Sequence, residues 1–483
     1  MLSPVKIKFS SLFRLRSIAL VMLGLCVTVV NAGQQSSKRP SITISIVNNS
    51  TVRVQIELAS PGDRWAFRNA FAGALGLGER IEQFQATRSN EPVPVKRLAP
   101  GEFRGEREAD TLSYEAHIPP RDTADIAHVS WLTASYGVLM LADLLPEAIT
   151  AGSIAFDLLA GWSARSSEAC DKTHPCSFDD SARQVYFVGK ELRATSTATH
   201  DIQVSEVVYG EWPVKDKSVL TSATRVLQRY VGLTNFRLRD KPTIILAPMP
   251  FSDSTVQWKA ETRGSTVVLL INPHANFKNF LGQISIIFTH EIFHLWVPNS
   301  LALQGDYDWF FEGFTSYIAL QTALNLKLIG FQEYLNTLER VYNSYLSYGD
   351  GQTLIEASER RWTSSTPVVY DKGMLAAFVY DVFVRRETRG QSSLADIYRS
   401  LFARHVDEPA NANDVIIKLL TSSPATESFS TTYIESRNRI QLEKVLSPFG
   451  FDINTEGSSS HLTIRKQLDP EQKNLMRGLG YRY

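Results

Sequence analysis

Two histidines and a glutamate near the middle of the chain have the types and spacing of a metal-dependent hydrolytic site. They form the segment His290-Glu291-Ile292-Phe293-His294, an HExxH pattern. In an α-helix, positions i and i+4 lie about 40° apart around the axis and about 6 Å apart along it. The side chains of His290 and His294 therefore project from one face, where both imidazoles can hold one zinc ion. Glu291 lies one step around the helix, where its carboxylate can act as a general base toward a water at the metal.

A third ligand is expected from the aromatic-rich segment that follows, because a catalytic zinc site keeps three protein ligands and one open position. Residues 309–317 read WFFEGFTSY and contain one carboxylate, that of Glu312. A buried carboxylate without a cation would be costly, which favours a metal ligand at this position. The linker 297–308 contains Pro, Asn, Gly and Asp residues that end the first helix and turn the chain back. The sequence therefore predicts two antiparallel helices that share one metal ion.

A chance occurrence is the alternative, since an HExxH pattern arises by chance in roughly one in a hundred chains of this composition. Two features argue against chance. The pattern follows the strongly apolar segment 280–288, and Glu312 comes at the distance expected for a helical hairpin. A zinc-containing protein without activity is a second alternative, but Glu291 serves catalysis rather than metal binding. The sequence favours an active hydrolase with one Zn2+ per chain.

At these residues the sequence resembles the glycyl-aminopeptidase-type metallopeptidases, which are related to aminopeptidase N and to the thermolysin-like gluzincins. The resemblance covers about residues 200–450, and more loosely the part before them. It rests on the motifs HEIFHLW at 290–296, WFFEGFTSY at 309–317 and VYDKG at 369–373. It implies a single catalytic zinc, hydrolysis of peptide substrates from the amino end, an N-terminal β domain and a thermolysin-like catalytic domain.

The resemblance also implies roles for two further residues. Tyr370, at the head of the YDKG segment, matches the tyrosine that stabilises the oxyanion in this family. Glu261 matches the carboxylate that binds the α-ammonium group of the substrate, and a serine follows it at the family's spacing. Trp258 and Lys259 replace the glycines of the family pattern, and Thr262 replaces its histidine. These departures leave endopeptidase activity open as an alternative to aminopeptidase activity.

The hydrophobic pattern predicts an α+β multidomain fold. Strands with alternating apolar residues, such as Ser41–Val47, indicate a sandwich-like domain first, and helical periodicity follows. The expected regions are a signal peptide at 1–32, a β-rich N-terminal domain at 33–213, a thermolysin-like zinc peptidase domain at 214–390, a C-terminal helical region at 391–450 and a polar tail at 451–483 without a PDZ module. The apolar segment 134–158 is interpreted as loop and helix. The resemblance implies that strand Thr266–Ile271 lines the edge of the cleft.

The first 32 residues have the features of a secretory signal. A basic start is followed by the apolar run Ser17–Val30 and by an expected cleavage site after Ala32. As a helix this run would span about 21 Å, short of the roughly 30 Å hydrocarbon core of a bilayer. We therefore expect no stable membrane span after cleavage. Cys26 would suggest a lipoprotein, but Leu25 is too bulky for the position before it. We expect a periplasmic or secreted protein.

Two cysteines remain after removal of this segment, Cys170 and Cys176. In an oxidising compartment they are expected to form a disulfide across a short loop. A second zinc site that includes His174 is the alternative, but such a site needs a fourth ligand. The chain has 50 basic and 50 acidic residues, which does not favour nucleic acid or anionic lipid as a partner. Peptide substrates are the expected partners, and the sequence does not indicate an oligomeric state.

Overall fold

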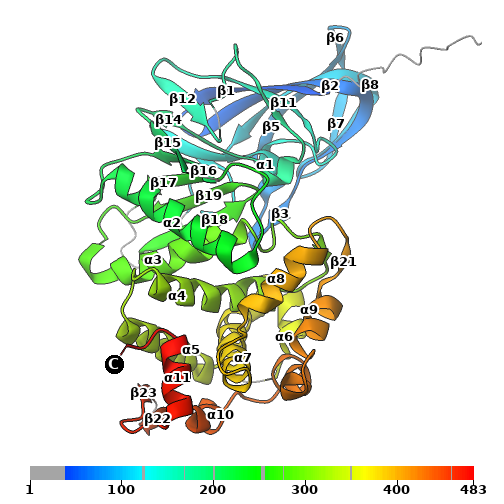
Figure 1. The fold of residues 1–483 in the computed structure, drawn as a ribbon. Helices are drawn as coiled ribbons and strands as arrows, with labels where there is room; N and C mark the ends of the chain where they lie inside the picture. Colours follow the sequence, from blue (N-terminus) through cyan, green and yellow to red (C-terminus); the bar gives the residue numbers. More distant parts are fainter. Residues whose placement is uncertain are drawn as a thin grey trace, which may run out of the picture. The chain divides into compact units, whose positions relative to one another are not determined.

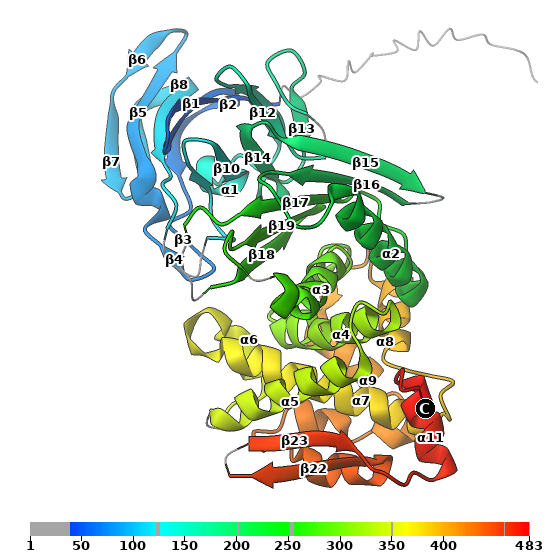
Figure 2. The same ribbon diagram turned by 90° about the vertical axis from the view of Figure 1, so that its left-hand side faces the viewer.

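The computed structural model describes residues 39–482 except for 122–125, 168, 200–201, 252–255, 276, 349–350, 458 and the side chains of 277–281. The expected signal peptide at 1–32 lies outside the described residues. Figures 1 and 2 show that β-sheets come first along the chain and that helices dominate after them. This order agrees with the predicted α+β multidomain fold, which is confirmed.

Two sheets from the first part of the chain pack face to face. In the described residues, the larger sheet has eight strands in the order β13-β11-β1-β2-β8-β5-β6, with β7 paired to β8, and the smaller sheet has four in the order β12-β14-β10-β9. The larger sheet contains β1 (Ser41–Asn48), β2 (Thr51–Ala66), β5 (Ile81–Arg88), β6 (Glu91–Val93), β7 (Val95–Ala99), β8 (Glu102–His117), β11 (Gly152–Asp157) and β13 (Cys176–Phe178). The smaller sheet contains β9 (Trp131–Leu132), β10 (Tyr136–Met140), β12 (Trp162–Arg165) and β14 (Val185–Lys190). The short helix α1 (Leu141–Leu144) follows β10. One apolar core lies between the two sheets, so the sandwich-like domain is confirmed.

A disulfide joins Cys170 and Cys176, which confirms the pairing expected from the sequence. Cys176 begins β13 of the larger sheet, and the amide of Cys170 donates a hydrogen bond to the carbonyl of Ala164 in β12 of the smaller sheet. The bridge therefore ties the two sheets together near one end. Because both sulfurs are used in the bridge, the alternative zinc site at these cysteines is excluded.

A third sheet forms one wall of the candidate site. Its order is β15-β16-β17-β19-β18, and it contains β15 (Arg193–Thr199), β16 (Ile202–Val208), β17 (Thr243–Pro248), β18 (Trp258–Arg263) and β19 (Thr266–Ile271). The inner strands run parallel, and β15 and β18 pair antiparallel at the two edges. The edge strand beside the candidate site is therefore β18, and the expectation that residues 266–271 form this edge is wrong. The expected domain boundary between 213 and 214 falls inside this sheet, after β16.

Alternate residues of the inner strands face different cores. In β10, Val138 faces the third sheet, whereas Leu139 faces the larger sheet. In β19, Val268 faces the smaller sheet, whereas Val267 faces the helices. A strand that is buried on both faces has an apolar sequence without alternation. For this reason the interpretation of 134–158 as loop and helix is corrected: the segment forms two strands, β10 and β11, and the short helix α1.

Helices pack against the free face of the third sheet. The first two are α2 (Asp216–Thr234) and α3 (Phe277–His294), and they share one apolar core with the sheet. The helices that follow are α4 (Thr315–Asn325), α5 (Phe331–Ser347), α6 (Leu354–Glu359), α7 (Gly373–Glu387), α8 (Ala395–Arg404), α9 (Ala412–Leu420), α10 (Leu442–Leu446) and α11 (Pro470–Gly478). Within the described ranges, none of the helices combines the length and the apolar character that crossing a membrane requires.

The segment expected as a polar tail is folded. It forms a hairpin of β22 (Phe451–Glu456) and β23 (Ser459–Ile464), followed by α11. Figure 2 shows this hairpin beside α5. Leu462 and Leu475 are buried in the same core as the helices. Residues 451–482 are therefore part of the packed helical region, because their few apolar side chains are spaced to reach it.

Candidate metal centre and active site

α3 and the segment that precedes α4 carry the three candidate metal ligands. His290 and His294 lie in the last turns of α3, and Glu312 lies in the π-helical segment Trp309–Phe314, which continues directly into α4. The hydroxyl of Tyr230 on α2 donates a hydrogen bond of 2.7 Å to the carbonyl of Thr289, which holds α3 in place. The helix pair expected from the sequence is confirmed, and it brings His290, His294 and Glu312 together.

The three candidate ligand atoms converge on one point. Nε2 of His290 lies 2.9 Å from Nε2 of His294, and Oε2 of Glu312 lies 3.1 Å and 3.3 Å from these two nitrogens. Ligands about 2.0–2.2 Å from a zinc ion at tetrahedral angles are about 3.3 Å apart, so this spacing suits a single zinc ion. The three side chains expose only 12%, 9% and 6% of their surface.

The surroundings of the two imidazoles determine which nitrogen carries a proton. Nδ1 of His294 lies 2.9 Å from the carbonyl oxygen of Val297, which can only accept, so Nδ1 is the donor. Nδ1 of His290 lies 3.3 Å from Oγ of Ser316, whose own hydrogen goes to the carbonyl oxygen of Glu312. Both Nε2 atoms therefore present lone pairs to Oε2 of Glu312.

Three converging lone pairs require a cation between them. Burial opposes a charge on His294, but the negative charge of Glu312 and its hydrogen bond outweigh burial and raise the pKa of His294 to about 9. A proton therefore takes this place when no metal is bound. Two imidazoles and one carboxylate are the ligand set of a catalytic zinc site with one open position. The residues present fit a zinc ion.

Glu291 and Tyr370 lie beside this cluster. Oε2 of Glu291 accepts a hydrogen bond of 2.8 Å from Oγ1 of Thr262. Burial raises the pKa of Glu291, despite the opposing charges of the two histidines. The ring of Tyr370 stacks against that of His290, with 6.2 Å between the ring centroids. The structure thus places both residues at the cluster, and their catalytic roles remain predictions.

Two glycines allow the segments that carry Glu312 and Tyr370 to touch. A Cβ atom on Gly313 would lie 2.6 Å from Cα of Gly373 and 2.6 Å from the carbonyl oxygen of Val369. No side chain fits between backbones that approach so closely. The glycine at the end of WFFEG and the glycine at the end of YDKG are therefore explained by one contact, which brings Tyr370 close to Glu312.

Arg361 also belongs to this site, although it was not predicted from the sequence. Its guanidinium lies 2.8 Å from Oε1 of Glu312 and 3.0 Å from the hydroxyl of Tyr370. Burial would raise the pKa of Glu312, but the positive charge of Arg361 and then that of His294 outweigh it and lower this pKa well below its usual range. No motif marks Arg361, because its partners lie 9 and 49 positions away (370 − 361 = 9; 361 − 312 = 49). Only the folded chain brings them together.

Glu261 lies on the edge strand β18, and its carboxylate already has two partners. Oε2 lies 2.5 Å from Nδ1 of His128, and Oε1 lies 3.1 Å from Nε of Arg263. Burial would raise the pKa of Glu261, but the hydrogen bond and charge of His128, followed by the charge of Arg263, outweigh it and lower this pKa. The guanidinium of Arg263 stacks on the ring of Phe71 in β3 (Ala70–Phe71), which pairs with β4 (Ala74–Leu75). The pairing with His128 was not predicted.

The cluster borders two cavities. The larger has a volume of about 860 Å³ and is lined by Trp258, His290, Glu291 and Tyr370 among other residues. The smaller has a volume of about 270 Å³ and is lined by Glu261 as well as by Glu291 and two of the candidate ligands. Glu291 and Tyr370 border both cavities.

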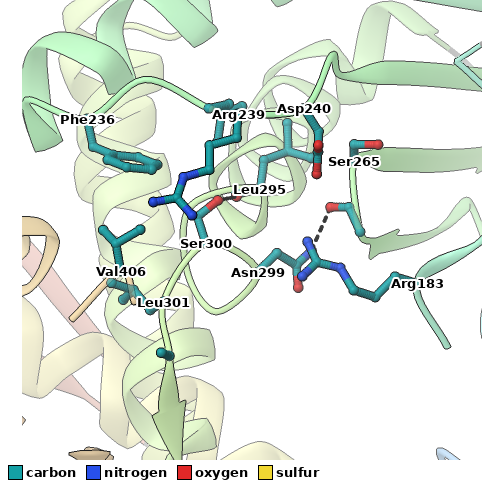
Figure 3. A pocket seen from close by; sticks show the side chains of 13 residues that line it. Arg183, Phe236, Arg239, Asp240, Ser265, Leu295, Asn299, Ser300, Leu301 and Val406 are labelled. Atoms are coloured by element: carbon teal, nitrogen blue, oxygen red, sulfur yellow. Dashed lines mark hydrogen bonds between the residues drawn. The ribbon is translucent and has the colours of Figure 1, made fainter. Parts of the chain in front are cut away.

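A third cavity of about 440 Å³ lies behind the end of α3 (Figure 3). Among its described lining residues, none is a candidate metal ligand. Asn299 separates it from the smaller cavity, lining both and donating a hydrogen bond of 3.0 Å to the carbonyl of Gly264. Arg239, which Figure 3 shows at the cavity, is paired with Asp407. The candidate metal centre therefore borders the first two cavities and not this one.

Comparison with known proteins identifies the fold. No protein-family model and no curated protein sequence matches the chain. The structure is similar to an aminopeptidase N family protein from Idiomarina loihiensis, with a TM-score of 0.72 and 16% identity over 86% of this chain and 79% of that chain. It is also similar to an M1 zinc metallopeptidase from Deinococcus radiodurans, with a TM-score of 0.53 and 13% identity over 84% of this chain and 95% of that chain.

A mutant of the M1 zinc metallopeptidase from Deinococcus radiodurans has been solved with the substrate Tyr-Ser-Ala, and it matches with a TM-score of 0.53 and 12% identity. These likenesses confirm at the level of the fold the relationship to aminopeptidase N that the sequence resemblance implies. The chain therefore combines the fold of M1 zinc metallopeptidases with a His290, His294 and Glu312 cluster that fits a metal ion.

Proposed function

We propose that the chain is a zinc-dependent peptidase that releases residues from the amino end of peptides. One observation carries the proposal: the lone pairs of His290, His294 and Glu312 converge at a point that Glu291 also borders. The metal needs only the first three residues, whereas Glu291 supplies the base that hydrolysis requires. The similarity to M1 zinc metallopeptidases, one of them solved with a tripeptide substrate, supports the same class of reaction.

The residues have complementary tasks in hydrolysis. A zinc ion held by the cluster would lower the pKa of a bound water toward about 7. Glu291 accepts a proton from the attacking water as the water oxygen bonds to the carbonyl carbon. The hydroxyl of Tyr370 donates a hydrogen bond to the carbonyl oxygen as negative charge develops there. Glu291 then delivers the proton to the leaving nitrogen as the C–N bond breaks, which releases a carboxylic acid and an amine, and the acid passes its remaining proton to the amine to give a carboxylate and an ammonium group.

The sizes of the two cavities favour hydrolysis of a peptide bond near the amino end of the substrate. The cavity that contains Glu261 has a volume of about 270 Å³, against about 860 Å³ for the other. The smaller volume lies below the usual range for ligand pockets, so it suits a short terminal part of the substrate. Glu261 would pair with the α-ammonium group there. Endopeptidase activity is the second candidate, because the carboxylate of Glu261 is already paired with His128 and Arg263.

A peptide library tests the proposal. The zinc-loaded protein is incubated with peptides in matched pairs, one with a free amino end and one acetylated there, and the products are identified by mass spectrometry. We expect single residues to leave from the free amino ends, with little cleavage of acetylated partners and no cleavage after removal of the metal by a chelator. Internal cleavage at equal rates in both sets would support the endopeptidase.

Substitution of the ligands tests the metal centre independently of the substrate. The protein should hold about one zinc ion per chain, measured by elemental analysis after dialysis. His290→Ala and Glu312→Ala should lose zinc and activity together, because two ligands do not complete the site. Either variant with a full complement of zinc would contradict this ligand set.

We also propose that the chain is exported. The signal-like segment at 1–32 and the disulfide between Cys170 and Cys176 support this proposal. The exported protein should begin at Gly33, as read by amino-terminal sequencing, and its mass should be lower by two hydrogens than that of the reduced chain. Retention of residues 1–32, or two thiols that react with an alkylating reagent before reduction, would contradict export to an oxidising compartment.

A further inference from the structure

Arg361 connects two residues of the candidate site that have different tasks. One terminal nitrogen of its guanidinium donates to Oδ1 of Asp308 at 2.7 Å. The other lies 2.8 Å from Oε1 of Glu312 and 3.0 Å from the hydroxyl of Tyr370. The ring of Trp362 covers the guanidinium at 4.3 Å, and the side chain of Arg361 is 10% exposed. These contacts hold the guanidinium in one orientation.

The first consequence concerns the number of oxygens that Glu312 offers to a metal. Oε1 is occupied by Arg361, and only Oε2 faces the two imidazoles. A carboxylate that binds zinc through one oxygen leaves the fourth position free for water or substrate. Without Arg361, the carboxylate could rotate and turn both oxygens toward the metal. Arg361 therefore favours the contact through one oxygen.

The second consequence concerns the direction in which Tyr370 donates. A guanidinium has only donors, so the oxygen of Tyr370 must accept the hydrogen bond from Arg361. The hydrogen of the Tyr370 hydroxyl is then left for another acceptor, and the Tyr370 ring lies against His290 of the cluster. During hydrolysis the carbonyl oxygen of the substrate would become a stronger acceptor. Arg361 thus keeps the hydroxyl oriented as a donor toward the cluster.

We propose that Arg361 is a positioning residue that couples metal binding to stabilisation of the transition state. It holds Glu312 to a contact through one oxygen, and it orients the hydroxyl of Tyr370 through the same terminal nitrogen. The kinetic half of this inference rests on the proposed peptidase function, whereas the half that concerns metal binding does not.

A zinc titration tests the first half without substrate. Zinc dissociation constants are measured by competition with a chromogenic chelator for the wild type, Arg361→Met, Arg361→Lys and Asp308→Asn. We expect Arg361→Met to weaken zinc binding about 10- to 100-fold, as for other residues that orient a ligand. Arg361→Lys should have a smaller effect, because an ammonium keeps the charge but does not bridge two partners as a planar fork does. Asp308→Asn should have the smallest effect.

Arg385 offers a matched control in the same helical region. It is a largely buried arginine that pairs with Asp381 at 2.7 Å, and neither residue lines the two cavities beside the cluster. Arg385→Met therefore removes an ion pair of the same kind without touching the site. Its zinc dissociation constant should equal that of the wild type.

A double-mutant cycle tests the coupling itself. kcat and KM are measured at saturating zinc for the wild type, Arg361→Met, Tyr370→Phe and the double variant. In the wild-type background Tyr370→Phe should lower kcat about 10²- to 10³-fold. In the Arg361→Met background it should lower kcat by less than about 10-fold, because the hydroxyl is no longer oriented, and residues that act together are not additive. KM should change little in either background.

The outcomes separate the two proposals. Wild-type zinc affinity in Arg361→Met, or losses in kcat that simply multiply, would overturn the coupling while leaving the peptidase function intact. If Arg361→Met does not fold, the same two measurements on Arg361→Lys decide, with weakened zinc binding and a reduced effect of Tyr370→Phe expected. If the wild type hydrolyses no peptide, the proposed function fails and with it the kinetic half of the inference, and the zinc titration still decides the other half.

Discussion

The two walls of the candidate site hold their carboxylates in opposite ways. On the helical wall, Oε2 of Glu312 faces His290 and His294, and all three atoms carry lone pairs. On the sheet wall, Glu261 faces His128 and Arg263, which both act as donors toward it. Arg361 pairs with the outer oxygen of Glu312, but the point where the three lone pairs meet needs a further cation, whereas both oxygens of Glu261 accept from donors of the chain.

This difference shows why residue type alone does not identify a metal site. Glu312 and Glu261 are both largely buried and both have lowered pKa values. Each carboxylate also pairs with an arginine, so what distinguishes them is whether the neighbouring imidazole nitrogens donate or accept. Where the other ring nitrogen of each histidine is already the donor to the protein, the inner nitrogen keeps a lone pair that can accept a metal ion or a proton. Where a histidine donates directly to the carboxylate, no metal is required.

The largest loss of activity is expected on substitution of Glu291, the base on the helical wall. Glu291→Gln should keep zinc and lower kcat about 10²- to 10⁴-fold, because an amide cannot accept the proton of the attacking water. The amide oxygen can still accept the hydrogen bond from Thr262, so the packing should be preserved. Elemental analysis and steady-state kinetics on the same sample measure both quantities. Near-normal hydrolysis by this variant would remove Glu291 from the mechanism.

A somewhat smaller loss of activity is expected on substitution of Tyr370, the donor that Arg361 orients. Tyr370→Phe should lower kcat about 10²- to 10³-fold, which corresponds to roughly 3 to 4 kcal/mol in the barrier. Zinc content should not change, because the hydroxyl is not a ligand. Tyr342→Phe is the matched control, since it removes a tyrosine hydroxyl that pairs with Glu443 at 2.8 Å outside both cavities. Equal losses in the two variants would indicate a general effect on stability instead of a role for Tyr370.

Substitution of Glu261 on the sheet wall should cause a smaller loss of activity that depends on the substrate. Glu261→Gln should cost roughly 2 kcal/mol in kcat/KM, at the lower end for a desolvated charge pair, because His128 and Arg263 already share the carboxylate. The loss should appear for peptides with free amino ends and be absent for acetylated ones. Rates on paired peptides measure this selectivity. Equal losses on both, or a wild-type preference for acetylated peptides, would mean that Glu261 does not bind the amine.

The same comparison explains which parts of the site follow from the sequence. His290 and His294 lie one helical turn apart, so local geometry alone brings them together. Glu312 comes from the neighbouring helix, where the aromatic context already marks a carboxylate as unusual. His128 and Arg361 have no such signal, because their partners lie 133 positions away in one case and 49 in the other (361 − 312 = 49). Contacts of that kind depend on the packing of whole elements.

The strands also differ in whether the sequence alone predicts them. The alternating strands at 41–47 and 51–58 were predicted correctly because one face of each packs on the core and the other does not. The strand β10 was not predicted, since it is buried between two cores and its sequence has no alternation. Neither of its faces is polar, so a periodicity of two is lost, and a short apolar run does not distinguish a strand from a helix.

A third buried glutamate tests what happens when burial outweighs the charge of a neighbouring arginine, Arg193. Glu206 on β16 is 1% exposed, and its Oε1 has no hydrogen-bond partner in the described residues. Burial, and then the negative charge of Asp216, raise the pKa of Glu206 from 4.5 to about 7. Between these two values the folded chain holds a proton that the unfolded chain has released. The free energy of unfolding should therefore fall as the pH rises from 4.5 to about 7.

Glu206→Gln removes this titration and should reveal its size. At pH 8 the variant should be more stable than the wild type by about 1 kcal/mol, a value reduced to allow for solvent screening near the exposed neighbour Thr195. At pH 5 the advantage should be mostly absent, because wild-type Glu206 is then largely protonated and as neutral as an amide. Urea denaturation at the two pH values measures the difference. An advantage that is equal at both pH values would show that the gain comes from packing, and that the buried charge of Glu206 is not a source of instability in this sheet.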